Sequence, residues 1–140
     1  EIELEKPEQY EVLFYDLFSE TCSFLGQKGF QVVFHVDWVD SVVQISTDYV
    51  MRIFDNVTSN IVKYADPLAP VEISSVQEEH MVGFSVKNSI QRSGKKPEST
   101  GIGIQNINNM MQKMGGKSIV QEDEKQFRLV ILFPCLENKC

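Results

Sequence analysis

Residues 46–65 read STDYVMRIFDNVTSNIVKYA and contain the clearest periodic pattern in the chain. Their apolar residues recur at three- and four-residue steps, which predicts an amphipathic helix. Ser46 or Thr47 can cap its start, and Asp48 in the first turn complements the positive end of the helix dipole. The helix should end near Tyr64, because Pro67 follows closely. Its expected buried arc consists of Val50, Ile53, Phe54, Val57 and Ile61.

Beside this buried arc lie two carboxamides and an amine. Asn56, Asn60 and Lys63 fall within about 60° of the helix circumference, at ~100° per residue. Carboxamide oxygens can bind a hard cation such as Mg²⁺, which also keeps water and phosphate ligands. Lys63 can then neutralise phosphate charge. The spacing leaves open the alternative that these three residues form an ordinary solvated helix face.

A second pattern, STGIGIQN, occupies residues 99–106 at the predicted start of another helix. Gly101 and Gly103 let the backbone approach a ligand, and the N–H groups of the first turn can hold an anion. A dinucleotide-binding loop is excluded because Asn106 stands where the third glycine is needed and no buried strand precedes it. The glycines can also serve only a tight turn from loop to helix.

The rest of the chain predicts helices and strands in an alternating order. We expect further helices over residues 10–25 and 104–114, the second of them stopped by Gly115. Residues 87–100 are polar and lack periodicity, which predicts a surface loop. This order favours an α/β fold, a two-layer α/β sandwich with helices on one face of a mixed, mostly antiparallel sheet. The expected strands cover residues 30–38, 41–45, 71–76, 81–86, 117–121 and 127–133.

The composition of the chain limits the classes of partner that it can bind. The 140 residues include 20 acidic and 13 basic side chains, which give a formal net charge of −7. This charge argues against nucleic acid and against direct membrane contact, although a local basic cluster can still hold a phosphate. No apolar stretch is long enough for a membrane helix. The opening EIELEK suggests a piece of a longer protein.

Taken in order, the two motifs resemble those of the ATP-binding domain of sensor histidine kinases, in the GHKL superfamily that also contains gyrase B, Hsp90 and MutL. Residues 55–65 (DNVTSNIVKYA) resemble the N box of this family. Residues 101–107 (GIGIQNI) resemble its G2 box, and residues 114–116 (MGG) the turn after it. The resemblance covers nearly the whole chain. It implies one catalytic domain over residues 1–140 with the Bergerat fold and a lid at about 90–100, without the dimerisation, phosphoacceptor and sensor regions.

The resemblance implies a role for each matching residue. Asn60 corresponds to the ligand of a Mg²⁺ ion that bridges the ATP phosphates, and Asn56 to a catalytic polar partner near them. Lys63 corresponds to a phosphate contact that also assists catalysis. Tyr64 corresponds to an aromatic residue that packs beside the nucleotide. The phosphate contacts expected from the lid and the following loop are Arg92, Lys95, Lys96, Thr100, Gly101, Ile102 and Gly103.

One position departs from the family pattern. The G1 box, DxGxG, places an aspartate on the adenine amino group, whereas residues 86–90 here read VKNSI. Asn88 takes the acidic position, and its carbonyl oxygen can still accept a hydrogen bond from that amino group without charge assistance. Weaker nucleotide binding is the expected consequence. A nucleotide-free interaction module of the same fold is the alternative.

The resemblance also implies a reaction and its partners. The chain would bind Mg·ATP and present the γ-phosphate to a histidine on a separate dimerisation domain, from which a response regulator receives it. His35 and His80 do not fit that histidine, because they fall in a predicted strand and a turn. An anti-sigma-factor serine kinase of the same superfamily is a further alternative. The domain would be cytoplasmic, in a parent protein anchored in the bacterial membrane.

Overall fold

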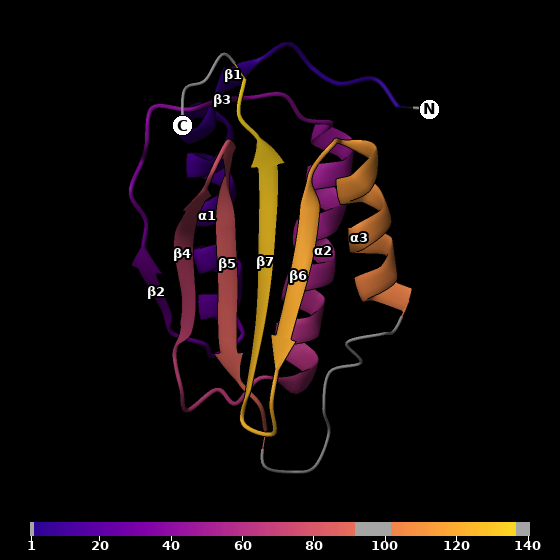
Figure 1. Cartoon of the computed structure of the whole chain (residues 1–140). Helices are drawn as coiled ribbons and strands as arrows, with labels where there is room; N and C mark the ends of the chain where they lie inside the picture. Colours follow the sequence, from indigo (N-terminus) through magenta and orange to yellow (C-terminus); the bar gives the residue numbers. More distant parts are fainter. Residues whose placement is uncertain (1, 92–101, 137–140) are drawn as a thin grey trace.

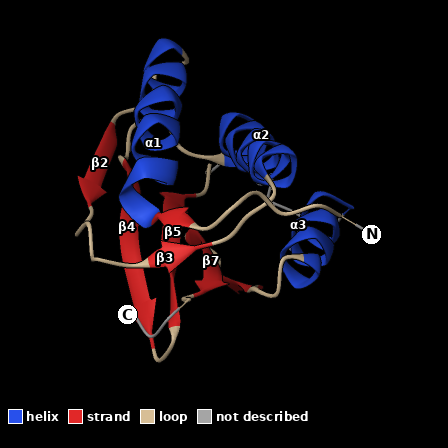
Figure 2. Ribbon diagram, turned by 90° about the horizontal axis from the view of Figure 1, so that it is seen from above, coloured by secondary structure: helices blue, strands red, loops and turns tan. Residues whose placement is uncertain are grey.

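Three helices cover one face of a five-stranded sheet in the computed structural model, which describes residues 2–91 and 102–136 (Figure 1). They are α1 (Tyr10–Gln27), α2 (Thr47–Tyr64) and α3 (Ile102–Lys113). Seen from above, all three lie on the same side of the strands (Figure 2). The predicted two-layer α/β sandwich is therefore confirmed. No helix in the described parts of the chain combines the length and apolar character needed to cross a membrane.

The sheet has the strand order β2-β4-β5-β7-β6. The β2–β4 pair is parallel, and the other three pairs are antiparallel. The expectation of a mixed, mostly antiparallel sheet is thus confirmed. The strands are β2 (Val32–His35), β4 (Val71–Glu78), β5 (Met81–Ser89), β6 (Lys117–Glu122) and β7 (Gln126–Pro134).

Strand β5 is longer than the sequence predicts, and the loop expected from Lys87 begins later. Residues 87–89 pair with residues 126–128 of β7 in regular antiparallel register. These polar residues lack the apolar alternation of a half-buried strand, so the sequence placed them in a loop. The neighbouring strands supply their backbone hydrogen bonds all the same. This extension brings Asn88 into the sheet, opposite Phe127.

The strand expected over residues 41–45 lies outside the main sheet. Strand β3 (Val42–Val43) pairs antiparallel with β1 (Glu8–Gln9), directly before α1. The backbone of Leu136, just past the main sheet, also donates to the carbonyl of Val42 at 2.8 Å. The small sheet therefore closes one end of the sandwich instead of widening it.

The strand expected over residues 30–38 is shorter in the structure and ends at His35. Beyond it, the backbone N–H of Asp37 donates to the hydroxyl of Ser75 at 2.8 Å. The N–H of Val39 donates back to the carbonyl of Asp37 at 3.0 Å. A local turn and a side-chain acceptor therefore replace ladder hydrogen bonds after β2.

Aromatic side chains form the core between the two layers. Phe14, Phe18, Phe54 and Phe84 have ring centroids between 5.1 and 6.5 Å apart, joining α1 and α2 to β5. Such offset and tilted pairs add to the free energy gained by burying the rings. Tyr10 is fully buried, and burial raises the pKa of its phenol, which therefore stays protonated and able to donate. The core thus fixes both helices against the strand that carries Asn88.

Candidate functional site

A narrow cavity lies between α2, α3, β5 and β7 and contains about 270 Å³ of empty space, measured to its open mouth. Its polar lining consists of three carboxamides, those of Asn56, Asn60 and Asn88. None of the described residues that line it is ionisable, so they offer hydrogen-bonding groups without charge. Apolar walls with a few fixed polar groups are typical of small-molecule sites. The apolar lining residues are Val57, Ile61, Val86, Ile104, Ile107, Phe127 and Leu129.

Helix α2 carries two of the three carboxamides, one turn apart. Of the two predicted caps it is Ser46 that caps the helix, its hydroxyl accepting from the backbone N–H of Tyr49 at 3.2 Å. Asn56 and Asn60 are each partly exposed. Neither side chain makes a hydrogen bond with any residue in the described part of the chain. Both carboxamides are therefore available to a ligand.

The third carboxamide, that of Asn88, is buried and comes from the extended end of β5. Only 4% of Asn88 is exposed. Its Nδ2 group donates to the carbonyl of Ser89 at 3.0 Å, which fixes the orientation of the amide. Its Oδ1 atom accepts from no donor among the described residues and can accept from a ligand. No buried side-chain oxygen among the described residues lacks a partner, so this atom is accessible from the cavity and can accept from an N–H donor of a ligand.

Gln91 ties the end of α2 to the end of β5. Its backbone N–H donates to the carbonyl of Tyr64 at 2.9 Å. Its side-chain Nε2 donates to the carbonyls of Lys63 at 3.3 Å and Ala65 at 3.2 Å. These bonds satisfy carbonyl groups that a helix end otherwise leaves free. They also hold α2 in a fixed position relative to the strand that carries Asn88.

Two predicted site residues, Lys63 and Tyr64, lie at the end of α2. Neither residue lines the cavity, and the side chain of Lys63 is exposed. Gly103 lies in the first turn of α3, and a Cβ atom added there would meet no other atom within 4 Å. Ile102 begins the same helix. The other predicted contacts, Arg92, Lys95, Lys96, Thr100 and Gly101, lie outside the described residues, as does most of the predicted lid.

The donor set of the cavity restricts the kind of metal ion it can bind. In residues 2–91 and 102–136 there is no group of three or more His, Cys, Asp or Glu side chains suited to a metal. A zinc or multi-carboxylate centre is therefore absent from this part of the chain. The amide oxygens of Asn56 and Asn60 fit a hard cation that takes few protein ligands and completes its shell from phosphate and water, as Mg²⁺ does.

Sequence reasoning did not identify the walls of the cavity. Val86, Phe127 and Leu129 come from neighbouring strands and are buried at 4%, 3% and 2% exposure. The alternation of Phe127 and Leu129 along β7 indicates only that both face the helices. The signal that could have found them is the pairing of β5 with β7, which a single sequence does not contain.

Comparisons with known proteins agree with this geometry. Residues 42–134 match the family model of the GHKL domain. The sensor histidine kinase YrkQ of Bacillus subtilis (strain 168) is 32% identical over 133 residues, which are 95% of this chain. The chain spans only 31% of the length of that relative.

Solved structures show the same fold. Histidine kinase AdeS of Acinetobacter baumannii has a TM-score of 0.71 at 10% identity, over 98% of this chain and 70% of its own. The catalytic domain of histidine kinase ThkA has a TM-score of 0.72 at 17% identity, over 95% and 97%. With the family match and the sandwich in agreement, the chain belongs to the GHKL family and is a domain of the kind found in sensor histidine kinases.

Proposed function

We propose that this chain binds Mg·ATP in the carboxamide-lined cavity and presents the γ-phosphate for transfer to a histidine on a separate dimerisation domain. The observation that carries the proposal is the meeting of Asn60 and Asn88 in one uncharged cavity of a GHKL domain. The carboxamide of Asn60 suits the metal–phosphate end of a nucleotide, and that of Asn88 suits its base.

The adenine base would occupy the apolar part of the cavity. The cavity is narrow and open at its mouth, so the phosphates would extend out of it. The Oδ1 atom of Asn88 would accept from the adenine amino group, while Ser89 holds the other end of the amide.

The phosphates would lie along α2 toward the start of α3. Asn60 would hold Mg²⁺, which when bound neutralises the charge that develops on the phosphates. Asn56 would orient the phosphates, and Lys63 would reach them from the solvent side. Phosphoryl transfer needs mainly positioning and charge stabilisation, which polar residues of this kind can supply. The contacts expected from Tyr64, Arg92, Lys95, Lys96, Thr100, Gly101, Ile102 and Gly103 belong to the same proposal.

The proposed protein partners are those of a sensor histidine kinase. The parent protein would carry the phosphoacceptor histidine on a dimerisation domain and pass the phosphate to an aspartate of a response regulator. This domain would work in the cytoplasm, in a parent protein anchored in the bacterial membrane. We expect the isolated chain to bind nucleotide without phosphorylating itself, because the acceptor histidine lies on another domain.

Nucleotide titration tests the proposal directly. With Mg·ADP at about 100 times its Kd, we expect the free energy of unfolding to rise by ~2.7 kcal/mol, since a ligand of the native state stabilises it. Thermal denaturation should show this as a higher Tm, and calorimetry should show the binding heat. MgCl₂ without nucleotide is the control and should leave Tm nearly unchanged. An unchanged Tm at millimolar Mg·ADP would instead favour an interaction module that binds no nucleotide.

Replacing Asn88 by aspartate is expected to raise the preference for ADP over inosine diphosphate about fivefold. A carboxylate accepts from the adenine amino group with charge assistance, whereas the loss of the Nδ2 bond to Ser89 affects both nucleotides alike. Inosine diphosphate carries a carbonyl in place of that amino group, so the same variant should bind it more weakly than the native chain does. Calorimetric Kd values for both nucleotides check the prediction. Equal changes in the Kd values of the two nucleotides would mean that the base does not lie beside residue 88.

A further inference from the structure

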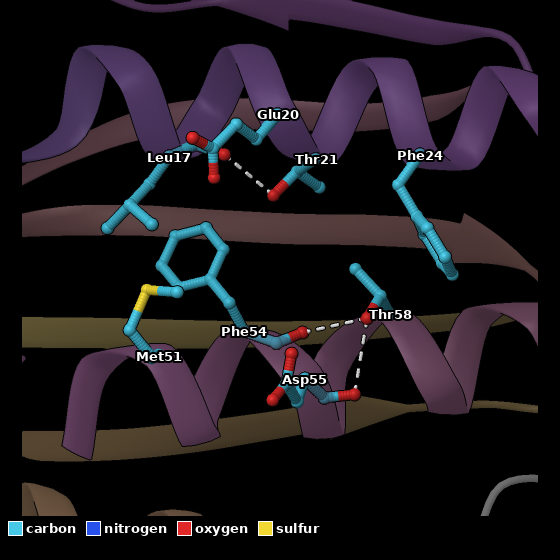
Figure 3. A pocket seen from close by; sticks show the side chains of 8 residues that line it. All are labelled: Leu17, Glu20, Thr21, Phe24, Met51, Phe54, Asp55 and Thr58. Carbon is cyan, nitrogen blue, oxygen red and sulfur yellow. Dashed lines mark hydrogen bonds between the residues drawn. The ribbon is translucent and has the colours of Figure 1, made fainter. Parts of the chain in front are cut away.

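A second hollow, the α1–α2 groove, lies between helices α1 and α2 (Figure 3). It encloses about 550 Å³, measured to its open mouth. Its apolar surface comes from both helices and includes Leu17, Phe24, Met51 and Phe54. Phe24 and Met51 keep 42% and 43% of their surface exposed, although both are large and apolar. The groove therefore leaves apolar area in contact with water that a bound side chain would cover.

Two threonines add little hydrogen-bonding capacity to this groove. The hydroxyl of Thr21 donates to the carbonyl of Leu17 at 2.8 Å, within α1. The hydroxyl of Thr58 lies 3.0 Å from the carbonyl of Phe54 and 3.2 Å from that of Asp55, within α2. Figure 3 shows these bonds as dashed lines along each helix. Both threonine hydroxyl protons are thus donated to carbonyl groups of their own helices.

The strong polar groups of the groove are two carboxylates, one from each helix. Glu20 lies on α1 and Asp55 on α2, and both are exposed. Neither forms an ion pair with another residue in the described parts of the chain. An apolar surface flanked by two unpaired negative charges is complementary to an apolar group flanked by positive charges.

We propose that the α1–α2 groove docks a basic amphipathic helix of a partner protein. A large apolar side chain of that helix would enter between Leu17 and Phe54. Lysine or arginine residues on the two flanks of that side chain would pair with Glu20 on one wall and Asp55 on the other. A helix lying in a groove through apolar residues at i, i+3 and i+4 is a recurring mode of peptide recognition.

A second copy of this chain does not suit the groove. The charged side chains of α1 are Glu11, Asp16 and Glu20, all acidic. Two copies that met through α1 would bring like charges together, which disfavours association. The net charge of −7 also favours a basic partner over another copy.

The groove and the nucleotide cavity use different residues of α2. The groove takes Met51, Phe54, Asp55 and Thr58, whereas the cavity takes Asn56 and its neighbours at the following turn. No residue in the described part of the chain lines both. The docking proposal can therefore be tested without disturbing the cavity.

A fluorescent 18-residue helical peptide of leucine and lysine, with leucine at every third or fourth position, is a suitable probe. We expect it to bind the native chain, as measured by fluorescence anisotropy, whereas the same pattern with glutamate in place of lysine should not bind. The double change Glu20→Gln and Asp55→Asn should weaken binding about tenfold. The double change Glu79→Gln and Glu124→Gln removes as much charge from exposed sites elsewhere and should leave the Kd unchanged.

A second pair of variants tests the apolar contact. Met51→Lys places a cation in the groove and should abolish peptide binding. Val12→Lys makes the same charge change at an exposed position of α1 outside the groove. It should weaken peptide binding only as much as the change in net charge does. Mg·ADP titration of both variants should match that of the native chain, so that failure of docking and failure of nucleotide binding remain distinguishable.

Two outcomes would overturn the docking proposal. The first is equal weakening by the groove pair and the distant pair of carboxylate changes, which would mean that only net charge attracts the peptide. The second is concentration-dependent dimerisation of the native chain in analytical ultracentrifugation that Met51→Lys abolishes. That result would assign the groove to a second copy of the chain.

Discussion

Replacing Asn60 by leucine is expected to weaken Mg·ATP binding by about 100-fold, which corresponds to ~2.7 kcal/mol. The carboxamide lines the cavity and makes no hydrogen bond within the described residues, so its oxygen is free to hold a cation. Leucine has the same number of side-chain heavy atoms and the same branching but offers no oxygen, and Mg²⁺ takes oxygen ligands. Calorimetric titration with Mg·ATP measures the loss.

The metal dependence of this effect separates a ligand from a packing residue. In EDTA, where no Mg²⁺ is available, the native chain and the Asn60→Leu variant should bind ATP equally weakly. Ser59→Ala, at the exposed neighbouring position of α2, is the matched control and should bind Mg·ATP like the native chain. If Asn60→Leu retains full Mg²⁺-dependent affinity, the assignment of the metal end of the cavity to α2 is wrong.

Helix α2 could be predicted from sequence because its signals are local. The cap at Ser46, the apolar spacing and the stop before Pro67 all lie within about twenty residues and agree with one another. The spacing also placed Asn56 and Asn60 beside the buried arc. Lys63 does not line the cavity, because the cavity follows positions 56, 57, 60 and 61 of the helix.

The end of β5 could not be predicted, because the interactions that form it are not local. Residues 87–89 are polar, and what makes them a strand is their pairing with β7, about forty residues later in the chain. Local propensity is a weak guide where a distant partner supplies the hydrogen bonds. The resemblance to the G1 box pointed to Asn88, but its burial and the cavity wall at Phe127 depend on that long-range pairing.

The same pairing leaves no room for a side chain at Gly83. Gly83 lies in β5 opposite Leu132, and a Cβ atom added to it would lie 1.7 Å from the carbonyl oxygen of Ile131. That oxygen belongs to the backbone of β7, so a side-chain rotation cannot relieve the overlap. The carbonyl of Gly83 also accepts from the hydroxyl of Tyr10 at 2.7 Å, which anchors α1.

We therefore expect Gly83→Ala to lower the free energy of unfolding by more than ~4 kcal/mol, a large part of the roughly 5–15 kcal/mol of a typical domain. Thermal denaturation should show a fall in Tm of about 10 °C or more. Gly26→Ala in the last turn of α1 is the matched control, because no atom lies within 4 Å of its added Cβ. It should leave Tm unchanged or raise it slightly, since alanine favours helix over glycine. Because β5 also carries Asn88, Gly83→Ala should weaken nucleotide binding as it weakens the fold, whereas an unchanged Tm would mean that β5 and β7 can separate locally without loss.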